Sequence, residues 1–284
     1  MIKIGGNEKF ALREGWLTKG LKLVKDSDSN PFLDEDAIVK FGMGPNMVKA
    51  LRYYLKTSDM IIEKKDQCTL NSENGIDVLI KEDPYFEDDF CYFIFHYLIV
   101  SNNKNKTIFS FLFNNIEEEI FDKEKIKDTV KKIASISNER INDKTLDNDI
   151  SIVLNMYAKE KIKDIEDTYV SPLINLKLIK RIDSNYYKKI SENTKCLPAN
   201  LVYFSIVNCM RNGEEAISLN DLANRENSPI KAFNLNRDQI NLYIDLLRKK
   251  GMLRFESTAG LNMIYPIKTI TLKDVIKEHY NKCR

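Results

Sequence analysis

A run of basic and amide side chains in the first fifth of the chain has the chemistry needed to contact DNA. Lysine and arginine neutralise phosphates or pair with guanine, and asparagine can pair with adenine, when they share one exposed face near a helix start. Residues 37–58 contain four basic side chains and no acidic one. The side chains at helical spacing here are Asn46, Lys49, Arg52, Tyr53 and Lys56. This pattern predicts the recognition helix of a helix-turn-helix motif, and its alternative is an ordinary solvated helix face.

A second basic cluster lies near the C-terminus. Residues 237–250 have apolar side chains at helical spacing, and Gly251 suits the position just after a helix. Strands at 252–257 and 261–265 follow, and helices ending in a hairpin predict a winged helix. The candidate DNA contacts here are Arg237, Asn241, Arg248, Lys249, Lys250 and Arg254. Two alternatives remain: basic residues at a helix end complement the helix dipole, and winged helices also bind proteins.

The acidic run at residues 81–89 is the one segment that suggests catalysis. Asp83, Glu87 and Asp88 are candidate ligands of a divalent metal in a nuclease. Consecutive carboxylates spread around a helix start, however, where they favour the helix dipole. We therefore expect a structural role, no catalytic residue and no enzymatic activity. His96, in an apolar helix, is expected to be a hydrogen-bonded core residue.

The elements that must position the first cluster are short helices. We expect a helix over residues 9–25, a shorter one over 35–41, a turn at Gly42–Pro45, and the longer helix over 46–57, followed by a strand at 60–63. Basic residues on the earlier elements extend the candidate DNA surface. They are Arg13, Lys19, Lys22 and Lys40.

The middle of the chain is predicted to be helical. Residues 86–100 should form a buried helix, and 121–135 and 146–157 should form amphipathic ones. Residues 107–114 fit either a helix or a strand. The expected fold class is mainly α with small β-hairpins, with an N-terminal helix-turn-helix module that resembles a winged helix (1–70), a helical middle domain (71–190) and a C-terminal winged-helix domain (191–284).

Composition sets limits on function. The chain has 284 residues, of which 43% are hydrophobic and 30% charged, which is typical of a globular protein. Five scattered cysteines and two histidines do not predict a disulfide framework or a zinc site, and we expect no metal and no cofactor. We also expect no signal peptide, no membrane span and a cytoplasmic location.

The net charge of +2 conceals an uneven distribution. Residues 1–56 have a net charge of +3, residues 57–179 of −8, and residues 180–284 of +7. Two basic ends around an acidic middle predict two surfaces for a polyanion, with ordinary surface variation as the alternative. We expect the two basic ends to converge into one groove wide enough for double-stranded DNA.

Several segments resemble a bacterial family known as domain of unknown function 4007. They are GWLTKG (15–20), AIVKFGMGPNMVKALRYYLK (37–56), DPYFEDDFCYFIFHYLI (83–99) and GMLRFESTAGLNMIYP (251–266). The resemblance runs from about residue 8 to residue 270, and GxGxNMVxxxRY is its most specific part. Tyr54 stands where family members often have Trp, and Pro45 where Lys is common, which removes one expected basic contact.

The resemblance implies a place in phage-defence islands, beside proteins similar to phosphoadenosine-phosphosulfate reductases and including DNA phosphorothioation and related exclusion systems. Together with the basic clusters, it favours a non-enzymatic protein that grips duplex DNA in such a system. The alternatives are an adaptor that holds a sulfur-transfer or restriction partner, and a transcriptional regulator of the defence locus. Oligomeric state and the preference for modified or plain DNA are left open.

Overall fold

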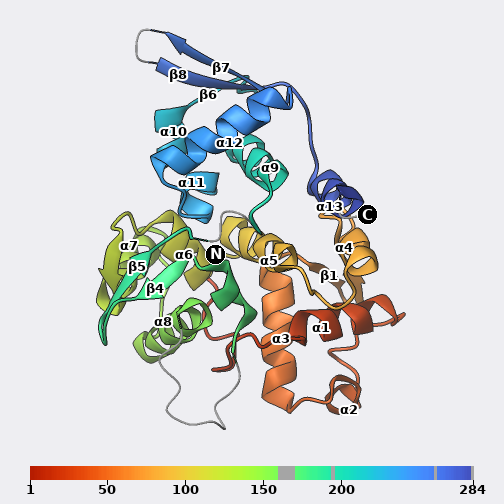
Figure 1. The fold of residues 1–284 in the computed structure, drawn as a ribbon. Coiled ribbons are helices and arrows are strands. Elements are labelled where there is room, and N and C mark those ends of the chain that lie inside the picture. The colour runs from red at the N-terminus through yellow and green to blue at the C-terminus, as the bar shows by residue number, and fades with distance from the viewer. Residues whose placement is uncertain (159–169, 193–195, 259–260, 283–284) are drawn as a thin grey trace.

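The computed structural model describes residues 1–158, 170–192, 196–258 and 261–282. It is mainly helical and contains three small antiparallel sheets in this part of the chain (Figure 1). A single cluster of buried apolar side chains runs through elements from both ends of the sequence. No helix of the described residues is long and apolar enough to cross a membrane.

The N-terminal part consists of three helices and a hairpin. They are α1 (Trp16–Lys25), α2 (Ala37–Phe41), α3 (Pro45–Thr57), β1 (Ile61–Lys64) and β2 (Gln67–Leu70). Gly42 ends α2 in the left-handed conformation (φ 56°), which a residue with a side chain adopts at a cost. Pro45 occupies the first turn of α3, where its missing N–H has no helical partner. These two residues set the tight turn that places α3 across α1.

The middle part surrounds the long buried helix α5 (Asp89–Ser101). Ten of its side chains from Phe90 to Ile99 are buried, so it is covered on all sides. The other elements are α4 (Ile76–Glu82), α6 (Ile108–Asn114), β3 (Ile120–Asp122), α7 (Lys123–Ile136), α8 (Asp143–Tyr157), the 3₁₀-helix η2 (Pro172–Leu176), β4 (Ile179–Arg181) and β5 (Tyr186–Lys189). Strand β5 lies between β3 and β4 in a three-stranded sheet.

The C-terminal part repeats the plan of helices followed by a hairpin. Its elements are α9 (Ala199–Cys209), β6 (Ile217–Ser218), α10 (Leu219–Asn224), α11 (Pro229–Ala232), α12 (Arg237–Lys249), β7 (Leu253–Thr258), β8 (Leu261–Pro266) and α13 (Leu272–Lys282). Asn236 and Gln239 form a capping box at the start of α12. Strand β8 lies between β6 and β7. Helix α13 leaves this part and packs on α4 as well as on α9.

His96 joins the middle of the chain to the C-terminal part. Its Nε2–H donates to the carbonyl of Ala232 (2.6 Å), because a carbonyl oxygen can only accept. Its Nδ1 therefore accepts from the hydroxyl of Tyr157 (2.6 Å). Burial lowers the pKa of His96 to about 4, so the ring is neutral near pH 7. The expectation of a hydrogen-bonded core histidine is confirmed.

Several element boundaries differ from the sequence-based prediction. The first helix begins at Trp16 rather than at residue 9, because Glu8, Lys9 and Gly15 have positive φ angles that interrupt a helix. Residues 107–114 contain the helix α6, which settles the open alternative. Phe121 belongs to strand β3 rather than to the helix that follows. The prediction of mainly α structure with small hairpins is confirmed in this coarse form.

Candidate nucleic-acid interface

Helix α3 has one apolar face and one polar face. Val48, Leu51 and Leu55 are buried against α1 and the core. Gly20 of α1 lies so close that an added Cβ would come within 2.7 Å of Leu55. The opposite face of α3 is the α3 strip, which we define as Asn46, Lys49, Arg52, Tyr53 and Lys56. The structure therefore gathers all five predicted residues of this helix on one side of it.

The members of the α3 strip differ in how free they are to bind a ligand. Asn46, Lys49 and Lys56 are exposed, whereas Arg52 and Tyr53 are half-buried at the edges of the strip. Within the described chain, Lys49 makes no ion pair or side-chain hydrogen bond, so its ammonium group is available to a phosphate. No acidic residue occurs in α3. The exposed surface of this helix is therefore uniformly basic or neutral.

Glu63 on strand β1 fixes two of these cations. Its carboxylate accepts hydrogen bonds from Arg52 Nε (2.6 Å) and NH2 (3.1 Å) and is paired with Lys56. Asn30 donates a further bond of 3.1 Å to the same carboxylate. Burial alone would raise the pKa of Glu63, but these donors more than offset it and the pKa is lowered. Glu63 thus holds Arg52 in place on α3 and neutralises part of the basic charge.

We expect Glu63→Gln to lower the free energy of unfolding by about 1–3 kcal/mol at pH 7, because two cations lose their shared anion. The lowered pKa means that the carboxylate stabilises the fold above its ordinary pKa of 4.5, and that this stabilisation is lost as the pH falls through the lower folded value. Urea denaturation between pH 3 and 7 measures both effects. If acid lowered the free energy of unfolding of Glu63→Gln by as much as that of the wild-type protein, the stabilising role of the Glu63 carboxylate would be contradicted.

Tyr53 and Asn46 face the N-terminal segment of the chain. A Cβ on Gly6 would lie 2.2 Å from the Tyr53 ring, so the backbone there packs directly on that ring. The Tyr53 hydroxyl donates to the carbonyl of Lys3 (3.1 Å). Asn46 lines a small cavity of about 270 Å³ that Asp149 of α8 also lines. Tyr53 is therefore held by the protein itself, while Asn46 stays exposed at the rim.

Asp149 holds this N-terminal segment against α8. Its carboxylate accepts from the backbone N–H of Gly5 (2.7 Å) and from Asn7 Nδ2 (2.9 Å). Burial raises the pKa of Asp149 despite these two hydrogen bonds. The start of α3 is thus buttressed by a segment that precedes it by forty residues.

The remaining N-terminal candidates have different surroundings. Lys19 and Lys22 are exposed on α1, and Lys19 Nζ would lie 3.8 Å from a Cβ added at Gly42, beside the turn into α3. Lys40 is paired with Asp34 (2.7 Å) and Asp36 (3.0 Å). The Arg13 guanidinium lies over the rings of Phe10 and Trp16. Of these four residues, Lys19 and Lys22 best extend the α3 strip.

Helix α12 presents a less uniform surface. Arg237, Asn241 and Arg248 share one edge of its exposed face, and Lys249 and Lys250 lie at its C-terminal end. Two acidic residues, Asp238 and Asp245, are exposed on the same face, and Asp245 is paired with Arg248 (3.3 Å). Beside them, the side chains of Leu242 and Leu246 are 70% and 42% exposed. Carboxylates on this face repel phosphates, and exposed leucines are more typical of a protein contact.

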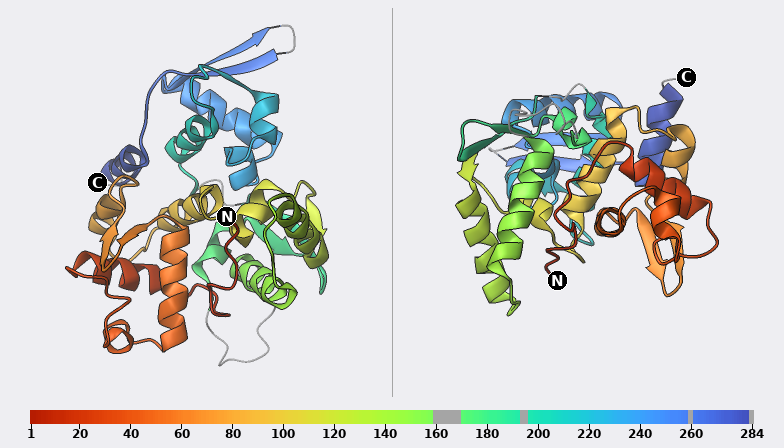
Figure 2. Two further views of the ribbon diagram at one scale, coloured as in Figure 1. Left: turned by 180° about the vertical axis from the view of Figure 1, so that it is seen from behind. Right: turned by 90° about the horizontal axis from the view of Figure 1, so that it is seen from below.

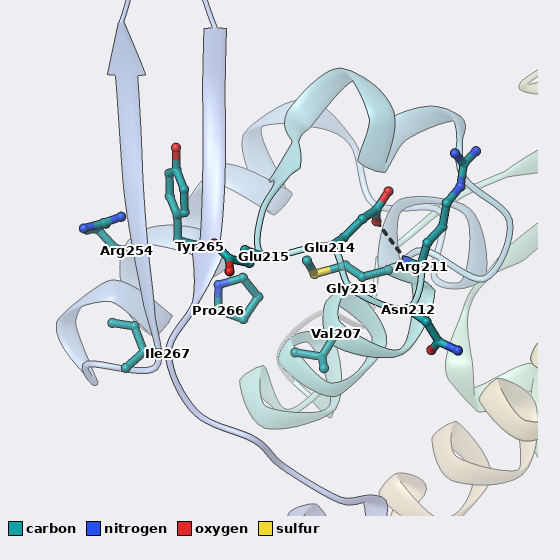
Figure 3. A pocket seen from close by; sticks show the side chains of 11 residues that line it. Val207, Arg211, Asn212, Gly213, Glu214, Glu215, Arg254, Tyr265, Pro266 and Ile267 are labelled. Carbon is teal, nitrogen blue, oxygen red and sulfur yellow. Dashed lines mark hydrogen bonds between the residues drawn. The ribbon is translucent and has the colours of Figure 1, made fainter.

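Arg254 lies apart from the cations of α12. Its neighbour Leu253 is buried on the side that packs on α12, and successive side chains in a strand point to opposite faces. Arg254 stacks on Tyr265 (4.5 Å to the ring centroid) and is paired with Glu256 (3.2 Å). Both Arg254 and Tyr265 line a cavity of about 620 Å³ between the hairpin and the loop at residues 211–215 (Figure 3). Arg254 and α12 therefore do not form one surface.

In the part of the chain that the structure describes, the two basic ends do not form the expected single groove. Helices α3 and α12 lie at opposite ends of the molecule, with α5 and α9 between them (Figure 1). The view from behind shows the same separation (Figure 2). The expectation that the two basic ends converge is thus wrong, because α5 of the middle part and α9 of the C-terminal part pack between α3 and α12. Any DNA contacts by α3 and α12 are made to separate segments.

The acidic run serves the fold. Asp83 is buried and accepts the backbone N–H groups of Glu87 and Asp88, both at 3.0 Å. Asp88 caps α5 through Phe90 N–H (2.9 Å) and binds His279 Nε2 (2.7 Å). The hydrogen bond from His279 lowers the pKa of Asp88. No group of three or more potential metal ligands occurs in the described residues, and the hydrogen bonds of Asp83 and Asp88 instead stabilise the start of α5.

We expect Asp83→Asn to lower the free energy of unfolding by about 1–3 kcal/mol. Two carboxylate oxygens of Asp83 accept backbone N–H groups, whereas asparagine has one oxygen, and its NH₂ group would face the second backbone N–H. Thermal denaturation measures this change. Duplex DNA incubated with the wild-type protein and Mg²⁺ or Mn²⁺ should stay intact. Metal-dependent cleavage that Asp83→Asn abolishes in a folded variant would contradict the structural role.

Some features of the interface could not be read from the sequence. Glu63 follows α3 by several residues, and only the hairpin geometry brings it to Arg52 and Lys56. The exposure of Leu242 and Leu246 was also missed. The signal was available in this case, because both leucines fall outside the apolar stripe of Ile240, Ile244 and Leu247.

These observations describe a mainly helical protein with small antiparallel sheets and an exposed basic helix near its N-terminus. The chain belongs to a family of proteins of unknown function, DUF4007, whose model matches residues 5–280. This match confirms the resemblance found in the sequence motifs. A search of the curated proteins finds no match.

Two solved structures have a similar fold. One, titled "Magnesium ion-bound SspB crystal structure", is 20% identical and has a TM-score of 0.83, and the alignment covers 99% of this chain and 87% of that chain. The other, titled "SspB crystal structure", is 21% identical with a TM-score of 0.82 and the same coverage. At this level of identity the likeness establishes the fold alone.

Proposed function

We propose that this protein is a DNA-binding component of a bacterial phage-defence system, and that the α3 strip is its principal DNA contact. The observation that carries the proposal is the composition of that strip. It presents exposed Asn46, Lys49 and Lys56 on one helix face with no acidic residue in the helix. Such a face can neutralise phosphates and reach base edges in the major groove.

The order of elements supports a winged-helix interpretation of both ends. In the N-terminal part α3 is the third helix and is followed by the β1–β2 hairpin. In the C-terminal part β6, β8 and β7 form a small sheet beside the helices α9 to α12. In winged helices the helix before the hairpin is the one that enters the major groove. By this reasoning α3 and α12 are the two recognition helices.

The role proposed for the C-terminal module is secondary. Arg237, Asn241 and Arg248 offer a second contact with a separate stretch of DNA. The exposed Leu242 and Leu246 favour the alternative function, an adaptor that holds a sulfur-transfer or restriction partner through α12. The association with defence islands that the sequence resemblance implies is compatible with both versions. The proposal assigns no catalytic step, cofactor or metal to the chain.

Binding of a fluorescent duplex, measured by polarisation from 50 to 300 mM salt, tests the proposal. Phosphate contacts predict that the logarithm of the affinity falls linearly with the logarithm of the salt concentration, with a slope near −0.9 per phosphate neutralised. Plain and phosphorothioated duplexes should be compared at each salt concentration. Absence of binding to both at 50 mM salt would refute the DNA-binding function and leave the adaptor.

A further inference from the structure

A cavity unrelated to the α3 strip lies where the middle of the chain meets the C-terminal part. Its volume is about 630 Å³, and its walls come from the end of α6, from β5, and from α10, α11 and the start of α12. Ile190, Ile230 and Leu235 give it apolar walls, and Asn224 and Asn234 add amide groups. A volume of this size is typical of small-molecule sites.

Two ammonium groups line this cavity. Lys189 Nζ donates to the carbonyl of Ile116, and Lys231 Nζ donates to the carbonyl of Asn114 (2.9 Å). Lys231 thereby caps the C-terminal end of α6, Lys189 binds the segment just after it, and each uses one of its three N–H donors. Across the described ranges, neither ammonium is paired with a carboxylate within 4.0 Å. The two lysines therefore leave charge and donors for an anion.

The carboxylates near the cavity form no ion pair with these lysines, although the charges of Glu118 and Glu117 act on Lys189. Glu119 is paired with Lys188 (3.0 Å). Glu117 and Glu192 also line the cavity, but both are exposed at its rim. Burial and the nearby charge of Lys231 lower the pKa of Lys189 to about 8. Two neighbouring cations in a partly buried site are stabilised by a bound counter-anion.

We propose that this cavity binds a small phosphate-bearing molecule of mononucleotide size, with its phosphate between Lys189 and Lys231. The apolar walls would contact a base or another flat ring, and the amides of Asn224 and Asn234 would face its polar edge. The site is independent of DNA binding by α3, so either proposal can fail without the other.

Titration calorimetry of the full chain with inorganic phosphate and with AMP tests the site. AMP should bind at least tenfold more tightly than phosphate, because only AMP reaches the apolar walls. Lys189→Met with Lys231→Gln should weaken AMP binding at least tenfold, and Lys132→Met, on α7 and outside the lining of the cavity, should leave it unchanged. No binding of either ligand at 10 mM, or equal affinity in the double variant, would overturn the proposal.

A second measurement needs no variant and applies even if the double variant does not fold. Acetylation of the wild-type protein at pH 8, followed by peptide mass spectrometry, reports the accessibility of each lysine. AMP should slow the modification of Lys189 and Lys231 at least fivefold and leave the exposed Lys132 on α7 unaffected. If saturating AMP left the acetylation rates of Lys189 and Lys231 unchanged, as it should leave that of Lys132, the proposal would be overturned.

Discussion

Lys49→Glu combined with Lys56→Gln should weaken binding to duplex DNA at least tenfold at 100 mM salt, or by about 1.4 kcal/mol. The double variant removes two positive charges from the α3 strip and adds one negative charge, a net change of −3. Each lost phosphate contact also reduces the slope of the logarithm of the affinity against the logarithm of the salt concentration by about 0.9. Glutamine at position 56 can still donate to Glu63, which keeps the bidentate Arg52–Glu63 pair in place. Fluorescence polarisation measures the affinity.

A matched control separates contact from overall charge. Lys132→Glu combined with Lys123→Gln makes the same charge change at two exposed positions of α7, a helix that lies away from α3 (Figure 1). This control should weaken binding less than threefold. Arg237→Glu combined with Arg248→Gln places the same change on α12 and measures the contribution of the C-terminal module. Equal losses in the α3 and α7 variants would mean that only net charge attracts DNA.

His96→Ala should lower the free energy of unfolding by about 3–5 kcal/mol, the largest loss of stability that we expect from one substitution. It leaves a cavity between Phe113 and Phe233, whose rings contact the imidazole, and it removes the partners of Tyr157 and Ala232. Urea denaturation followed by circular dichroism measures the effect. A loss below 1 kcal/mol would contradict the central position of His96.

The pH dependence of stability provides a control for this assignment. Because the folded-state pKa of His96 is about 4 and its ordinary value is 6.5, the unfolded chain binds the proton more readily. The neutral ring therefore stabilises the fold fully above pH 6.5, and this stabilisation falls by about 3 kcal/mol as the pH drops from 6.5 to 4. His96→Ala should remove this component of the pH profile. If the substitution left the pH dependence of the free energy of unfolding unchanged, groups other than His96 would cause that dependence.

The sequence predicted the secondary structure best where periodicity and end signals agree. The helices α3 and α12 have apolar stripes together with a proline, a glycine or a capping box at their ends, and both were found within a few residues of the expected bounds. The segment at residues 9–15 lacks such an end signal. Its backbone geometry depends on Gly5 and Asn7 binding Asp149, a contact between residues more than 140 positions apart.

The arrangement of the two basic ends could not be predicted, because it depends on tertiary packing. Residue counts show that both ends are basic, but the distance between them is set by α5 and α9, which pack between α3 and α12. The cavity between Lys189 and Lys231 could not be predicted either, because it too depends on tertiary packing. These lysines are 42 positions apart and meet only because β5 and α11 both pack against the end of α6.

The separation of α3 and α12 also changes how the chain would act on DNA. A single groove would have gripped one duplex from two sides. Two distant helices instead allow α3 to hold DNA while the mixed basic and apolar surface of α12 holds a second DNA segment or a protein partner. Helix α13, which packs on both α4 and α9, links the C-terminal part to the middle part.

The central claim is that α3 touches DNA, and site-specific crosslinking measures this directly. A photoreactive benzoylphenylalanine replaces Lys49 in one preparation, Leu242 of α12 in a second and Lys132 of α7 in a third. After irradiation with a radiolabelled duplex, we expect a strong protein–DNA crosslink from position 49 and none above background from position 132. A crosslink from position 242 without one from position 49 would contradict the proposed role of α3 and assign the DNA contact to the C-terminal module.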